Sequence, residues 1–176
     1  MSNIPDQLRA NNLAKILDEF RTKYLQLARK SQLHGIVICD QDAKVLAVNS
    51  FFDDSINYWD IGAIGAALYG VSKQGKDFFG ASDLERASLI YANTQFFVHS
   101  IGSVKVESRK TRELVLILIG SKRMNIGLAV MQMRQFAPRI KKEVEMDQKS
   151  QSAMKMSEQE FFKHISELKG QIFGNT

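Results

Sequence analysis

The stretch DIGAIGAALYG, from Asp60 to Gly70, decides how we interpret the fold of this chain. Asp60 stands where an N-cap carboxylate would accept hydrogen bonds from the first free amides of a helix. Gly62, Ala66 and Gly70 then recur at every fourth position, so they line one face of that helix. Glycine inside a helix costs about 1 kcal/mol relative to alanine, which indicates that another backbone lies close to this face. We expect this helix to meet a copy of itself; the alternative is a tightly packed helix within one subunit.

The length and composition of the chain indicate one domain with extensions. Its 176 residues, 44% of them hydrophobic, are enough to build a core. The start from Met1 to Asp6 lacks the pattern of a signal peptide, and no apolar run reaches the length of a membrane span. The single cysteine, Cys39, excludes an internal disulfide framework and fits a reducing compartment. We therefore expect a cytoplasmic protein without a membrane span.

The net charge of +5 comes from two parts of the chain. Lys and Arg outnumber Asp and Glu by 6 to 3 in residues 1–33 and by 4 to 0 in residues 121–140. The two signs stand at 8 to 10 in residues 34–120 and at 6 to 6 from residue 141 onward. The charge thus follows helix surfaces and forms no basic face with interleaved aromatic residues, so we expect no nucleic-acid partner. An acidic protein surface is the electrostatic partner that it favours.

Hydrophobic periodicity predicts an α+β fold. A helix is expected from Leu13 to near Ser31. Two runs rich in β-branched and other apolar residues, 35–40 and 45–48, are expected to form a β-hairpin. Further strands are expected at 87–91, 96–106 and 114–119, with a polar turn at 107–112; the last run is apolar enough for a strand buried on both faces. Asn125 caps the next helix, which Pro138 should kink or end. A linker at 148–152 and a capping box of Ser157 and Glu160 precede a final helix.

The predicted architecture is therefore five strands with helices on both faces of the sheet, followed by an extra C-terminal helix. We divide the chain into an N-terminal arm (1–12), a domain (13–140) and a helical extension (141–176).

Three parts of the sequence together resemble the roadblock (dynein light chain) family. The run from Gly35 to Val48 resembles its hairpin, and the stretch from Asp60 to Tyr69 resembles its central helix. A third likeness is to the start and register of the family's last core helix, at Asn125, Gly127, Leu128, Arg134 and Ile140. The chain departs from the family pattern at Ala43, where a turn glycine is common, at Pro138, and in the tail after Lys141.

This resemblance implies a profilin-like fold with an antiparallel sheet, and a non-catalytic platform that binds and regulates a small Ras-like GTPase. Some relatives assist GTP hydrolysis by placing switch elements of the partner. The alternative is a structural adaptor, or light-chain-like subunit, of a larger assembly without GTPase contact.

The resemblance also implies a dimer, either with a second copy or with a paralogous roadblock protein. The central helices would lie side by side and the third strands would pair. The interface residues that we expect are Gly62, Ala63, Ala66, Tyr69, Gly70, Ser88, Ile90 and Ala92.

Partner-binding residues are predicted at three further places. Trp59 is a candidate hot spot or a seal at a core edge, and Arg109, Lys110 and Arg112 steer an acidic partner or form a solvated turn. Phe161, Ile165 and Leu168 share one face of the tail helix, which is too apolar to stay solvated and should dock on its own dimer or on a partner.

We expect no catalytic residue, no metal site and no cofactor. Cys39 lies in an apolar strand, where an inert buried thiol is common, and the three histidines form no metal-ligand pattern with it. A small-molecule sensor is a third hypothesis, which the apolar run at 114–119 speaks against.

Overall fold

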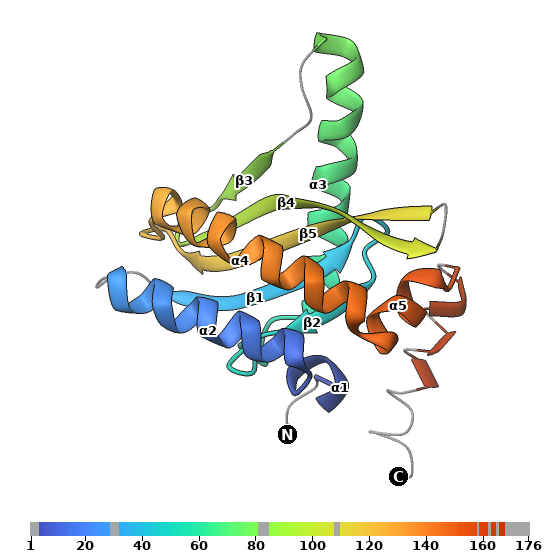
Figure 1. The fold of residues 1–176 in the computed structure, drawn as a ribbon. Helices are drawn as coiled ribbons and strands as arrows, with labels where there is room; N and C mark the ends of the chain where they lie inside the picture. Colours follow the sequence, from blue (N-terminus) through green and yellow to red (C-terminus); the bar gives the residue numbers. More distant parts are fainter. Residues whose placement is uncertain are drawn as a thin grey trace.

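The computed structural model describes residues 4–28, 32–80, 85–107, 110–157, 159–161, 163–164 and 166–167. It shows one five-stranded antiparallel sheet between helices (Figure 1). The helices are α1 (Asp6–Arg9), α2 (Asn12–Leu27), α3 (Tyr58–Phe79), α4 (Ile126–Met146) and α5 (Gln148–Lys155). The strands are β1 (Leu33–Asp40), β2 (Val45–Val48), β3 (Arg86–Ile90), β4 (Thr94–Glu107) and β5 (Lys110–Ser121), in the spatial order β2-β1-β5-β4-β3. The predicted fold class is confirmed, and so is the predicted order of elements from α2 to α4; the short helix α1 lies in the expected N-terminal arm.

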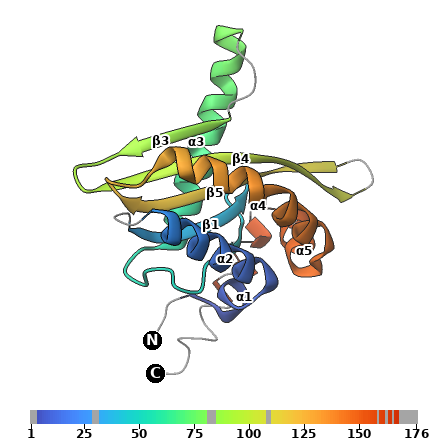
Figure 2. The same ribbon diagram turned by 60° about the vertical axis from the view of Figure 1, so that its left-hand side comes forward.

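Strand β5 separates two hydrophobic cores, because successive side chains of a strand point to opposite faces of the sheet. Leu114, Leu116 and Leu118 pack in the core that α2 and α4 cover, and Val115, Ile117 and Ile119 pack in the core beneath α3. Figure 2 shows α2 and α4 on the same side of the sheet. All six β5 side chains are buried, which confirms the prediction of a strand covered on both faces.

The two edges of the sheet differ. The outer edge of β2 is covered, since the Asn11 side-chain amide donates to the carbonyl of Leu46 over 3.2 Å and α1 packs against the strand. β3 is the other end strand, and among the described residues no strand lies beyond it. An open edge leaves backbone N–H and C=O groups free to pair with another chain.

Helix starts follow the predicted chemistry at two places and differ at a third. The side chain of Asn125 accepts from the amide of Leu128 over 3.0 Å, and Ser157 and Glu160 form the expected capping box. The cap of α3, however, is Asn57, whose side chain accepts from the amide of Trp59; Asp60 lies in the first turn. A carboxylate there still favours the helix through its interaction with the positive end of the dipole.

Three sequence predictions between residues 107 and 152 are wrong in detail. Helix α4 does not end at the exposed Pro138, because Phe136, Ile140 and Val144 on either side of it are buried in the core. The expected linker at 148–152 is part of α5, which Asp147 caps by accepting from the amide and hydroxyl of Ser150. The expected turn at 107–112 is shorter, because β5 already begins at Lys110. Ile140, the last residue of the expected domain, lies within α4.

Candidate interaction surfaces

The inner face of α3 packs on the chain's own sheet. A Cβ added at Gly65 would lie 2.2 Å from Cδ1 of Ile117, and one at Gly62 would lie 2.8 Å from Cγ2 of Val45. Ala66 and Tyr69 share this buried face. The glycines thus permit the close backbone approach inferred from the sequence, but at Gly62 the neighbouring chain segment is β2 of the same subunit. The expected placement of Gly62, Ala66 and Tyr69 against a second copy is corrected accordingly.

The outer face of α3 is open to solvent. Ala63, Ala67 and Val71 are exposed at consecutive helical turns, and nothing lies within 4 Å of the Cβ position of Gly70. This outer face, defined by Ala63, Ala67, Gly70 and Val71, retains two of the expected interface residues and adds two. The helical spacing of the large residues Tyr58, Ile61 and Tyr69, which the sequence-based prediction did not use, identifies the face of α3 that packs on the sheet.

The distal part of α3 extends beyond the sheet (Figure 1). No residue of α3 after Tyr69 is buried, and the side chains of Phe78 and Phe79 are 83% and 85% exposed. Gly80 ends the helix in the left-handed conformation, at φ 59°. Two neighbouring exposed phenylalanines on a projecting helix constitute an apolar surface that a second chain could cover.

The edge strand β3 presents backbone groups outward. The backbone amide of Tyr91 donates to the carbonyl of Thr94, and the carbonyl of Glu85 accepts from the backbone amide of Ser100. The backbone N–H and C=O groups of the odd-numbered residues therefore point toward β4. Since antiparallel pairing alternates along a strand, Ser88 and Ile90 direct their N–H and C=O groups away from the sheet. Ile90 is 65% exposed, and Ala92 is exposed in the turn before β4. The structure therefore leaves these three expected interface residues accessible.

The C-terminal segment packs on its own subunit. Phe161 is buried, and its ring centroid lies 5.7 Å from that of Trp59 in an edge-to-face contact. Trp59 also contacts Tyr58, at 4.7 Å between centroids. Trp59 and Phe161, both predicted to bind a partner, thus contact each other within one chain. Ile165 and Leu168 lie outside the described residues.

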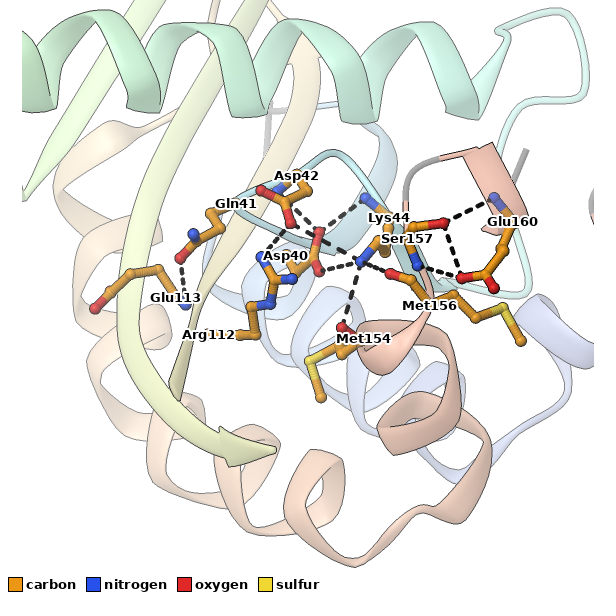
Figure 3. A network of polar contacts seen from close by, with 10 residues as sticks. All are labelled: Asp40, Gln41, Asp42, Lys44, Arg112, Glu113, Met154, Met156, Ser157 and Glu160. Atoms are coloured by element: carbon orange, nitrogen blue, oxygen red, sulfur yellow. Dashed lines mark hydrogen bonds and ion pairs between the residues drawn. The ribbon is translucent and has the colours of Figure 1, made fainter. Parts of the chain in front are cut away.

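A buried ammonium group joins the β1–β2 turn to this segment (Figure 3). The side chain of Lys44 is 1% exposed, and its Nζ donates to the carbonyls of Met154 (3.3 Å) and Met156 (2.7 Å). The carboxylates of Asp40 and Asp42 each lie 3.8 Å from the same nitrogen. Burial raises the pKa of the Asp40 carboxyl, although the backbone amide and charge of Lys44 act in the opposite direction. The sequence carried no signal of this contact, which joins residues more than a hundred positions apart.

The three cations predicted to steer a partner separate in the structure. The side chain of Arg112 is only 13% exposed and forms an ion pair with Asp42, so it supports the β1–β2 turn and does not lie in a solvated loop. Lys110 is exposed at the start of β5, and Arg109 lies outside the described residues. The partner-steering prediction for Arg112 is therefore corrected.

The side chains of Cys39 and His99 are buried. Burial raises the pKa of the Cys39 thiol, whose Sγ lies 3.9 Å from the carbonyl of Gly62. Burial likewise lowers the pKa of His99 in β4. Within the part of the chain that the structure describes, no cluster of His, Cys, Asp and Glu could hold a metal ion, and no helix is long and apolar enough to cross a membrane.

Solved structures with the same fold are found although the sequence itself has no match. No family model and no curated protein matches the sequence. A Roadblock/LC7 domain from Streptomyces avermitilis has a TM-score of 0.51 at 16% identity, over 68% of this chain and 92% of that one. MglB from Myxococcus xanthus has a TM-score of 0.57 at 12% identity, over 78% and 98%. An MglB structure described with a tetrameric arrangement has a TM-score of 0.57 at 14% identity, over 80% and 98%.

These similarities define the class of fold. The chain has a roadblock-type fold, as the resemblance of its sequence implies. One long helix, α3, covers one face of the sheet, and α2 and α4 cover the other. This arrangement positions the outer face of α3 and the open edge of β3.

Proposed function

We propose that this protein is a non-catalytic dimeric platform that binds and regulates a small Ras-like GTPase. The observation that carries the proposal is a roadblock-type fold in which the outer face of α3 and the edge of β3 are both uncovered. The GTPase itself is inferred from the family resemblance of the sequence. Regulation here means positioning the partner's own switch elements, so no arginine finger from this chain is required.

Two features support self-association. The small residues of the outer face of α3 allow a second helix to approach closely, and Val71 is 68% exposed beside them. The outward amides of Ser88 and Ile90 can pair with the same strand of a second copy, which would extend the sheet across two subunits. The MglB structure with a tetrameric arrangement shows that a protein of this fold self-associates.

The absence of a catalytic role in this proposal is supported by burial. The raised pKa of Cys39 keeps its thiol protonated at neutral pH, and a thiol is a weak nucleophile compared with a thiolate. Burial lowers the pKa of His99, against the opposing charge of Glu85, and so disfavours its charged form. An acidic protein partner is favoured by the basic segment at 121–140, in which Lys122 and Arg123 are exposed.

The experiment is a pull-down from native lysate with the immobilised full chain, followed by binding of each recovered small GTPase loaded with GTP or GDP. We expect at least one Ras-like GTPase to bind about tenfold more tightly in one nucleotide state, which corresponds to about 1.4 kcal/mol. Recovery of a stable assembly in which no GTPase contacts this chain would overturn the proposal and favour the adaptor function.

A further inference from the structure

The C-terminal segment from Met154 to Phe161 is attached to the domain at two points. At one end, two of its carbonyls accept from the buried ammonium of Lys44. At the other end, Phe161 packs against Trp59. Between these points the described side chains of Lys155, Ser157, Gln159 and Glu160 are exposed. The side chain of Met154 is also fully buried, in the core that α2 and α4 cover. The domain therefore holds the segment through two backbone carbonyls, the side chain of Met154 and the ring of Phe161.

The Lys44 contact does not depend on the side chains of the segment. Backbone carbonyls accept the hydrogen bonds, so a peptide of different sequence could provide the same acceptors. A buried ammonium without such acceptors is strongly unfavourable, even beside Asp40 and Asp42. Release of the segment opens this ammonium to water, and a second peptide that buries it again must supply the same two carbonyl acceptors.

Space remains beside the segment. A cavity of about 340 Å³ lies between α1, β2 and α5, and its lining includes Leu8, Val45, Leu46, Met156 and Phe161. Phe161 lines this cavity and also packs on Trp59, so the cavity lies next to the aromatic contact. The described part of the chain's own segment does not fill the groove completely.

We propose that Lys44, Trp59 and this cavity form a docking groove for a peptide of another protein, which the chain's own segment Met154–Phe161 occupies in cis. The partner peptide presents two backbone carbonyls two residues apart, an apolar side chain at the first of them, and a large aromatic side chain five residues after the second, as this segment does. Attachment in the same chain gives the segment a high effective concentration, on the order of millimolar. A partner therefore binds when it fills the groove better than the segment or when the segment is released.

The test uses the single tryptophan of the chain, Trp59, as a fluorescent reporter. In the full-length Phe161→Ala variant we expect its emission to shift to longer wavelength, because the ring that covers the indole is lost. A synthetic peptide of residues 153–167 should reverse this shift saturably and bind the variant about tenfold or more tightly than the wild-type chain. The same peptide carrying Phe161→Ala should bind at least tenfold more weakly. Phe51→Ala, which removes an exposed ring near Arg21, serves as the matched control and should leave the emission unchanged.

Three results would overturn the proposal: an unshifted emission in Phe161→Ala, no saturable effect of the peptide, or equal binding of both peptides. A second measurement covers the case in which the variant loses its native circular dichroism. In the wild-type chain, the amide of Phe161 donates to the carbonyl of Ser157 over 3.0 Å. Saturating peptide should displace the segment and accelerate hydrogen exchange at this amide, whereas unchanged exchange contradicts a replaceable cis segment.

Discussion

At the scale of single residues, Ala43 shows how a departure from the family pattern becomes a structural strain. Its φ of 64° lies in the left-handed region, and among the described residues no other non-glycine residue has a positive φ. The side chain of Asp40 holds the turn by accepting from the amides of Asp42 (2.9 Å) and Lys44 (3.0 Å). The sequence identified Ala43 as unusual, and the backbone conformation supplies the reason.

Replacing Ala43 with glycine should stabilise the protein. An L-residue in the left-handed region is disfavoured by about 1–2 kcal/mol, and part of this gain is offset by the greater backbone freedom of glycine in the unfolded chain. We expect Ala43→Gly to raise the free energy of unfolding by about 0.5–1 kcal/mol, measured by urea denaturation. The control, Ala137→Gly inside α4, should lower it by about 1 kcal/mol. A loss of stability in Ala43→Gly would show that the turn adopts another conformation.

At the scale of elements, the C-terminal extension shows what sequence patterns could and could not predict. The capping box of Ser157 and Glu160 follows from local chemistry and was predicted correctly. The place where the segment docks was not predictable, because it depends on the long-range contact between Lys44 and two backbone carbonyls. A lysine next to a strand is normally exposed to solvent, and no local sequence pattern distinguishes a buried lysine such as Lys44 from an exposed one.

The same limit applied to α3. Its existence and its close packing were apparent from the glycines, but an isolated helix pattern does not state which backbone approaches it. The spacing of Tyr58, Ile61 and Tyr69 assigns Gly62 to the sheet and leaves Ala63 outside. Substitution of Gly62 with leucine would therefore disturb the packing on Val45, and it is not a clean test of dimer formation.

The Lys44 contact predicts a large effect at the element scale. Lys44→Met leaves the buried Asp40 carboxylate without its nearest cation and the carbonyls of Met154 and Met156 without a donor. We expect the free energy of unfolding to fall by about 3 kcal/mol, measured by urea denaturation. The double variant with Asp40→Asn should recover part of this loss, because the uncompensated charge is removed. The exposed Lys105→Met is the control, with a change within about 0.5 kcal/mol. An equally small change in Lys44→Met would contradict a buried ammonium.

At the scale of the whole molecule, the two sides of the fold have different roles. α2 and α4 cover one core, and the C-terminal segment docks against the β1–β2 turn and the start of α3. The outer face of α3 and the edge of β3 remain uncovered in the single chain. Sequence order and periodicity were sufficient to predict the α+β architecture, and the resemblance to the roadblock family identified the type of fold. Which surfaces remain open could be determined only once the packing of every element was known.

The central claim, that two copies join through the outer face of α3 and the edge of β3, is tested most directly by the molar mass in solution. Light scattering of the wild-type chain should give twice 19.9 kDa. Val71→Asp places a charge on the outer face of α3, and Ser88→Pro removes an outward amide of β3 while sparing its pairing with β4. Combined, they should give a folded monomer, whereas the exposed Met131→Glu on α4 should leave the dimer intact. A wild-type mass of 19.9 kDa, or an undiminished dimer in the double variant, would contradict the account.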